Sequence, residues 1–289
     1  MKNFKLKLVV LSTLSCLASG QAMADWENLP AAGVSVGSDT SPYILCNPTG
    51  NFGSGSGANA PVQPFSTSDK CAVIPIVDIL APDSNFSGVL QYPVTTASTP
   101  IVMNNSYTNN TDVNIGTLTE YVWRRSTVTN TYQCIYGMKI TLNDHDYDSN
   151  QAGQQWFEIN DMARKGWSGK SIDVAYSTVP TQASPTYRIG RTFTSVQHAN
   201  TSNYIDQPLI GLGANPAISS IQNANIDPEW IDFTIQSGYA TGAASGLQFI
   251  RTECSDTSFT NGAAYIRLRQ TSRAGQPPIE VEVTGFIPN

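Results

Sequence analysis

The sequence predicts a mainly β protein, an antiparallel β-sandwich of jelly-roll-like or Ig-like form with long loops and one short helix. Three observations support this prediction. Short segments of alternating apolar and polar residues recur along the chain, separated by turn signals rich in Gly, Pro and Asn. Segments with helical periodicity are scarce. Only 13% of the 289 residues are charged, whereas Ser, Thr, Asn and Gln make up about a third, a composition that suits an extracellular β protein.

The first 24 residues are expected to be a signal peptide. Three lysines precede a short, mostly apolar run over 8–17, and the tripeptide at 22–24 (Ala-Met-Ala) is a cleavage motif. The apolar run is too short to serve as a permanent membrane anchor, and no later run reaches 18 apolar residues. We therefore expect a protein exported to the periplasm, the cell surface or the extracellular space, without a transmembrane anchor.

Removal of this signal makes the chain more acidic. Taking three lysines from 16 basic residues leaves 13 against 22 acidic ones, a net charge of −9. This balance disfavours nucleic acid and anionic lipid as partners. The low charge content also argues against a coiled coil and a multi-span membrane protein.

Two regions follow the signal peptide. Residues 25–115 form a Gly/Pro/Asn-rich N-terminal β region that contains a loop closed by a disulfide, with candidate strands over 72–80 and 88–94. Residues 116–289 form the main antiparallel β domain. The two regions are either separate units or parts of one domain.

The main region carries the clearest strand patterns. Two pairs of segments read as β-hairpins, because alternating runs flank short turns. The first pair is 117–125 and 132–142, and the second is 265–270 and 279–283. The remaining predicted strands are 172–178, 186–197, 230–236 and 247–252.

The short helix is predicted over 154–165. Its apolar positions repeat at helical spacing, and Gly166 suits the residue that follows a helix. Acidic residues lie toward its start and basic ones toward its end, an order that matches the helix dipole. The apolar positions are Trp156, Ile159, Met162 and Ala163.

Four cysteines remain after Cys16 leaves with the signal, an even number in an exported chain. Two disulfides are the natural interpretation, and three pairings are possible. We favour Cys46–Cys71 and Cys134–Cys254. A zinc site is disfavoured, because the sequence has no C-x-x-C motif and only two histidines.

An acidic turn is the most specific local motif. Asp144, Asp146, Asp148 and Asn150 alternate directly after a predicted strand, and clustered carboxylates suit Ca²⁺, which prefers oxygen ligands. The segment does not match an EF-hand loop. We predict these four residues as candidate Ca²⁺ ligands, with a solvated acidic turn as the alternative.

Arginines outnumber lysines and gather on predicted strands. Arg267 and Arg269 share one face of a strand by period two, so they are candidates for binding an anion or a carboxylate-bearing partner. The alternative is pairing within the chain, with acids such as Glu120, Glu280 and Glu282.

Other motifs carry little chemistry. The pattern G-x-S-x-G at 33–37 lacks the strand–turn–helix context of a hydrolase nucleophile. Nothing in the spacing brings His145 and His198 together. We predict no catalytic residue, and the protein is more consistent with a non-enzyme than with an enzyme.

Three functions remain from the sequence. The first is an exported structural or adhesive protein that acts by protein–protein contact and self-assembles as a homo-oligomer or filament. The second is a Ca²⁺-dependent protein that binds surface carbohydrates. The third, a secreted hydrolase, would use paired carboxylates.

Overall fold

The computed structural model describes residues 26–36, 39–45, 72–73, 93–127, 131–177, 186, 188–193, 226–238, 243–270 and 279–289. These residues are almost entirely strands and turns. The strands are β1 (Glu27–Asn28), β2 (Val34–Val36), β3 (Asp39–Ser41), β4 (Tyr43–Leu45), β5 (Ala72–Val73), β6 (Thr95–Met103), β7 (Val113–Ser126), β8 (Tyr132–Leu142), β9 (Glu158–Lys165), β10 (Ile172–Tyr176), β11 (Arg188–Gly190), β12 (Trp230–Gly238), β13 (Gln248–Cys254), β14 (Asn261–Gln270) and β15 (Ile279–Phe286). A 3₁₀ turn, η2, covers Ser106–Thr108.

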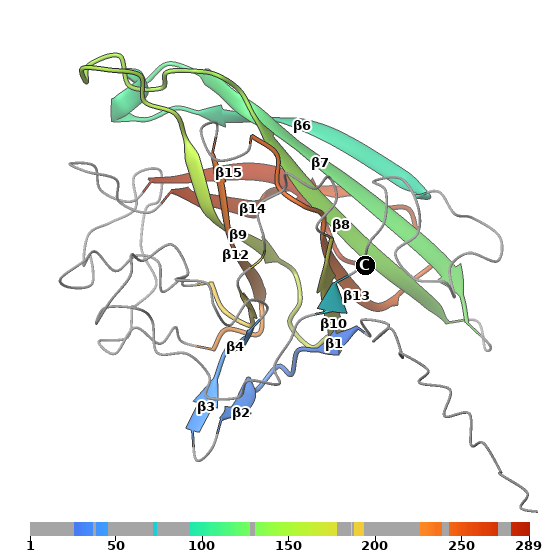
Figure 1. Ribbon diagram of the computed structural model, residues 1–289. Helices are drawn as coiled ribbons and strands as arrows, with labels where there is room; N and C mark the ends of the chain where they lie inside the picture. The colour runs from blue at the N-terminus through green and yellow to red at the C-terminus, as the bar shows by residue number, and fades with distance from the viewer. Residues whose placement is uncertain are drawn as a thin grey trace, which may run out of the picture.

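Two sheets pack face to face and form the predicted β-sandwich (Figure 1). The seven-stranded sheet has the order β1-β10-β13-β8-β7-β6, with β5 also paired to β10, and the six-stranded sheet has the order β15-β14-β9-β12-β11-β4. All of these pairings are antiparallel except β5 with β10. Strands β2 and β3 form a separate two-stranded sheet. Both predicted hairpins are present, as β7–β8 and β14–β15.

The N-terminal region contributes strands to both sheets. Strand β1 pairs with β10 and β6 pairs with β7 in the seven-stranded sheet, while β4 pairs with β11 in the six-stranded sheet. The signal peptide, residues 74–92 and the Cys46–Cys71 pair lie outside the described residues. Among the described residues, no helix has the length and apolarity needed to cross a bilayer.

The facing surfaces of the two sheets form one apolar core. In the six-stranded sheet, Met162 of β9 lies between Phe233 and Leu268 in the register. All three side chains are fully buried and belong to the same cluster as Leu118 and Ile140 of the other sheet. Burial of such side chains is the main favourable contribution to folding.

The predicted helix over 154–165 is wrong. Residues 158–165 form strand β9, which lies between β14 and β12 inside the six-stranded sheet. Positions 159–164 are all buried, so the alternation of a half-exposed strand is missing and the apolar residues happened to fit helical spacing. The charged residues Asp161 and Arg164, predicted to lie toward the two ends of that helix, lie on opposite sides of β9.

A buried ion pair crosses the core between the sheets. The guanidinium of Arg164 donates to the Glu120 carboxylate of β7 at 2.6 Å, and both side chains are 1% exposed. Arg164 also donates to the carbonyl oxygen of Phe286, and Glu120 accepts from the backbone N–H of the same residue. The Arg164 guanidinium lies against the rings of Tyr136 and Trp167. Three strands, β7, β9 and β15, therefore meet at one charged contact.

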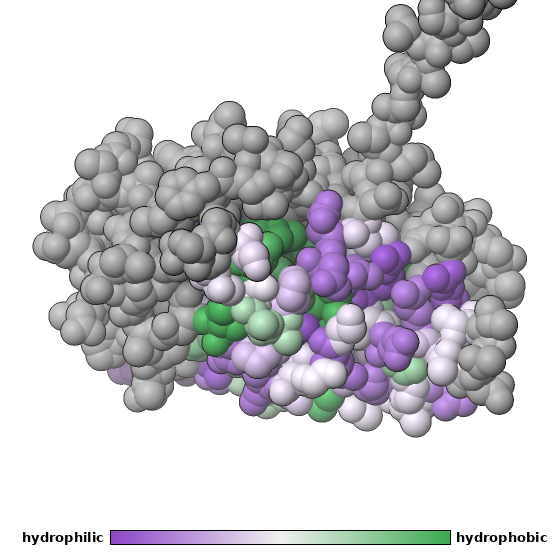
Figure 2. Space-filling view, turned by 90° about the horizontal axis from the view of Figure 1, so that it is seen from below, coloured by the Kyte–Doolittle hydropathy of each residue, from purple (hydrophilic) through white to green (hydrophobic). Residues whose placement is uncertain are grey.

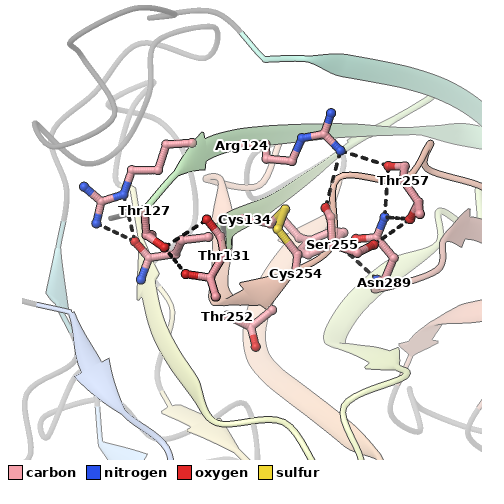
Figure 3. Close-up of a disulfide and its surroundings, with 12 residues drawn as sticks. Arg124, Thr127, Thr131, Cys134, Thr252, Cys254, Ser255, Thr257 and Asn289 are labelled. Carbon is pink, nitrogen blue, oxygen red and sulfur yellow. Dashed lines mark hydrogen bonds between the residues drawn. A yellow bond between two sulfur atoms is a disulfide. The ribbon is translucent and has the colours of Figure 1, made fainter. Parts of the chain in front are cut away.

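A disulfide joins neighbouring strands of the seven-stranded sheet. Cys134 of β8 bonds to Cys254 of β13, as predicted, with Cα atoms 5.8 Å apart and a sequence separation of 120. The loops beside it are tied by hydrogen bonds (Figure 3). Arg124 donates to the carbonyl oxygen of Thr257, and the Asn289 side chain donates to the same oxygen. The disulfide thus ties β13 to β8, and hydrogen bonds hold the C-terminal Asn289 to the loop after β13.

Replacing both cysteines of this bond by alanine, Cys134→Ala with Cys254→Ala, is expected to lower the free energy of unfolding by about 2–5 kcal/mol, because the unfolded chain loses a long covalent loop. Urea denaturation of the two oxidised proteins measures the difference. Equal unfolding free energies would contradict a stabilising role for this bond.

Replacing only one partner of the core ion pair, Arg164→Met, is expected to cost about 3–5 kcal/mol, because the Glu120 carboxylate is left buried without its countercharge. Adding Glu120→Gln to that variant should restore much of the lost stability. A double-mutant cycle in urea measures both effects. If the single and double variants are equally unstable, the loss comes from packing rather than from charge.

Candidate functional site

The acidic turn between β8 and β9 is closed by its own hydrogen bonds. The Asp146 carboxylate accepts from the backbone N–H groups of Asp148 and Gln155 at 3.1 and 3.2 Å. Asp148 accepts from the N–H of Asn150, and Asp144 accepts from the indole N–H of Trp156. The carboxylates therefore build the turn, as Asp commonly does.

These bonds bear directly on the predicted calcium site. The side-chain N–H of Asn150 donates to the side-chain oxygen of Asn109 in another loop. The described residues contain no group of three or more His, Cys, Asp or Glu arranged to hold a metal. Calcium at Asp144, Asp146, Asp148 and Asn150 stays a prediction. His145 is exposed in the same turn, and His198 lies outside the described residues.

The two predicted arginines lie on the outer face of the six-stranded sheet, the face turned away from the core. Arg269 is fully buried and contacts Glu280 at 2.6 Å and Asp161 at 3.2 Å. Arg267 is 14% exposed and pairs with Glu280 and Glu282. Both guanidinium groups already hold carboxylates of their own chain, which is the alternative that the sequence left open.

More charged side chains line up with these arginines. The register across the sheet places Glu280, Arg269, Asp161, Thr234 and Arg188 in one row, contributed by β15, β14, β9, β12 and β11. All five are at most 2% exposed. We call these five residues together with Asp232 and Tyr43 the outer-face cluster.

Aromatic rings lie over the arginines of this cluster. The Phe193 ring lies 4.1 Å from the Arg269 guanidinium carbon, and the Tyr43 ring lies 4.2 Å from that of Arg188. Phe193 also packs on Trp230, with ring centroids 4.6 Å apart. The rings exclude water while the flat guanidinium faces stack on them.

Electrostatics inside the cluster are strongly perturbed. Burial opposes the charge of Arg269, but Glu280, Asp161 and Asp232 together raise its pKa above the ordinary value. Burial raises the pKa of Asp232 well above 3.8, and the neighbouring Asp161 raises it further. Burial likewise raises the pKa of Tyr43 well above 10, so its hydroxyl stays neutral.

The acids of this cluster are not identified as a site by the sequence pattern. The sequence pattern assigns Asp161 to a helix, and it gives Asp232 no role within the predicted strand 230–236. A usable signal was present, because Asp232 and Thr234 alternate with Ile231, Phe233 and Ile235. That pattern predicts a polar row on one face of a strand. It does not reveal that the polar row is buried.

The other notable surface is an open strand edge. Within the described part of the chain, β6 is the last strand of its sheet and pairs only with β7. Its nine residues, TTASTPIVM, include no charged side chain. Thr96, Ser98 and Pro100 are exposed. Strands β6 and β15 lie close together at this side of the sandwich.

Exposed large apolar side chains are rare elsewhere. Seen from below, hydrophobic and hydrophilic residues are interspersed on the described surface (Figure 2). Among the described residues only Val94, Val102 and Ile226 are exposed large hydrophobics. Val94 directly precedes β6 and Val102 lies near its end, so two of these three mark the open edge.

Comparison of the chain with protein-family models, with curated proteins and with solved structures finds no match.

Replacing Asp146 by alanine is expected to lower the free energy of unfolding by about 1–3 kcal/mol, because two backbone N–H groups lose their acceptor. Thermal denaturation with and without EDTA measures this, and Asp112→Ala at an exposed site is the matched control. A melting temperature of the wild type that rises with added Ca²⁺, and does not rise in Asp146→Ala, would instead support the predicted cation site.

Proposed function

We propose that the protein is an exported structural or adhesive protein that acts by protein–protein contact, with β6 as the contact. The partner is a second copy of the chain, whose own β6 pairs with it across a two-fold axis. The observation that carries the proposal is the uncharged edge of β6, which is open among the described residues and has an exposed valine near each end.

An edge strand offers unpaired backbone donors and acceptors to any extended segment. Monomeric proteins commonly guard such edges with charged side chains, especially lysine. Strand β6 has none along its nine residues. Pairing between edges is an established mode of protein–protein recognition, in which main-chain hydrogen bonds supply affinity.

Charge favours this edge over other parts of the surface for self-association. The chain carries a net charge of −6, with 16 basic and 22 acidic residues. Two copies therefore repel one another on average. A neutral strand brings the copies together without placing like charges opposite each other, which would destabilise the pair.

The sequence of β6 also suits a two-fold contact. Antiparallel pairing centred on Ser98 places Val94 of one copy opposite Val102 of the other, because both lie four residues from the centre. The two side chains are 38% and 39% exposed in the single chain. The dimer would bury two such valine pairs, and an apolar cross-strand pair contributes roughly 0.2–1 kcal/mol.

Pro100 limits this contact without preventing it. Proline lacks a backbone N–H, so each strand loses at most one hydrogen-bond donor along the edge. A two-fold contact uses the same patch on both copies and closes on itself. The contact therefore produces a dimer, and a filament would need a second surface.

Replacing Ser98 by lysine is expected to raise the dissociation constant of the dimer at least about tenfold, because two lysines meet at its centre. Sedimentation velocity over a wide concentration range measures the constant. Ser258→Lys is the matched control, since it adds the same charge at another exposed serine. The control should associate like the wild type.

Two results would count against the proposal. One is a wild type that remains monomeric at its highest soluble concentration. The other is a dimer that Ser98→Lys and Ser258→Lys weaken equally, which would indicate a general charge effect at a different contact.

A further inference from the structure

The acids of the outer-face cluster lie side by side on adjacent strands. In the register of β9 with β12, Asp161 is opposite Thr234 and Asp232 is opposite Ala163. Asp161 and Asp232 are therefore diagonal neighbours on the same face, and their side chains are within hydrogen-bonding contact. Both residues are 0% exposed.

A hydrogen bond between two carboxyl groups requires a proton. Two carboxylates are both acceptors, so without a proton they only repel. Among the described residues, no N–H or O–H group donates to either oxygen of Asp232. A buried charged oxygen with no donor would cost several kcal/mol, whereas a protonated Asp232 donates to Asp161 and removes that cost.

Charge balance points to the same proton. The buried groups that face Asp232 from the surrounding strands are Asp161, Arg269, Arg188, Tyr43 and, beyond Arg269, Glu280. Tyr43 is neutral, so among the described residues three carboxyls stand against two guanidinium groups. Adding Arg267 and Glu282 at the rim leaves the same excess of one negative charge. One proton makes the cluster neutral.

Within the described part of the chain, the pair is closed off from solvent. Both acids are fully buried beneath the sheet's outer covering of side chains, and no described cavity is lined by either of them. The arrangement is suited to responding to pH through stability rather than to turnover.

We propose that Asp161 and Asp232 share one proton in the folded protein, and that loss of this proton at higher pH destabilises the six-stranded sheet. The inference is independent of the β6 contact, because it concerns the opposite sheet. The contribution of this proton to stability falls as the pH rises, so the pair is a pH-sensitive device built into the fold.

The direction of the effect follows from proton linkage. Burial, with Asp161 beside it, raises the folded-state pKa of Asp232 well above its ordinary value of 3.8. The stabilisation from this proton is complete below the ordinary value and is lost as the pH rises through the folded-state pKa. Within that window one extra bound proton changes the unfolding equilibrium about tenfold for each pH unit.

The test compares the full exported chain with the variant Asp232→Asn and with the control Asp256→Asn, an exposed acid in the loop after β13. Asn mimics the protonated side chain and donates to Asp161 at every pH. Urea denaturation from about pH 5 to alkaline pH measures the unfolding equilibrium constant of each protein. For the wild type and Asp256→Asn this constant should increase with pH about tenfold more per pH unit than for Asp232→Asn. Equal slopes in all three proteins would overturn the proposal.

A second measurement does not depend on the variant folding. Infrared spectra of the wild type, with aspartate labelled at the carboxyl carbon, should contain the carbonyl band of a protonated carboxyl group at neutral pH. This band should disappear only when alkaline pH begins to unfold the protein. If the band is absent at neutral pH, no proton is shared and the proposal fails.

Discussion

The ion pair between Glu120 and Arg164 is the contact on which the sandwich depends, because it joins the two sheets through their shared core. The pair is 1% exposed on both sides and is completed by the backbone of Phe286. A buried pair of this kind contributes little net stability compared with apolar residues of the same size, but either charge alone would be costly. The pair therefore constrains how β7, β9 and β15 meet more than it stabilises the fold.

Buried charge recurs outside the core. Arg191 is 0% exposed, and its guanidinium donates to the carbonyl oxygens of Leu29, Trp167, Pro228 and Lys170. Burial lowers its pKa to about 10, which still leaves it charged at neutral pH. One side chain thus ties the segment after β1 to the β9–β10 turn and to the start of β12. In the outer-face cluster, the buried charged side chains are paired with one another, and aromatic rings cover them in place of water.

The predictable part of the fold is the part in which strand patterns flank clear turn signals along the chain. Hairpins β7–β8 and β14–β15 were predicted from alternation and turn residues, and the Cys134–Cys254 bond was the favoured one among three possible pairings. Strand β9 could not be predicted in this way, because both of its faces are buried and its charges are paired across strands far apart in sequence. The Asp161–Asp232 pair was missed for the same reason, since local pattern does not reveal diagonal neighbours.

The low charge content acquires a physical consequence once burial is known. Several of the few charged residues, among them Asp161, Arg164, Arg188 and Arg269, lie inside the protein and do not reach solvent. The charged residues that remain for the surface are fewer than the 13% of the composition. Neutral polar side chains must therefore do most to prevent association with neighbouring molecules. Thr and Ser can hydrogen-bond to water or to another strand with similar ease, whereas lysine resists being covered. Under the proposed function, a strand such as β6 would be well hydrated in isolation and would pair when a second edge is presented.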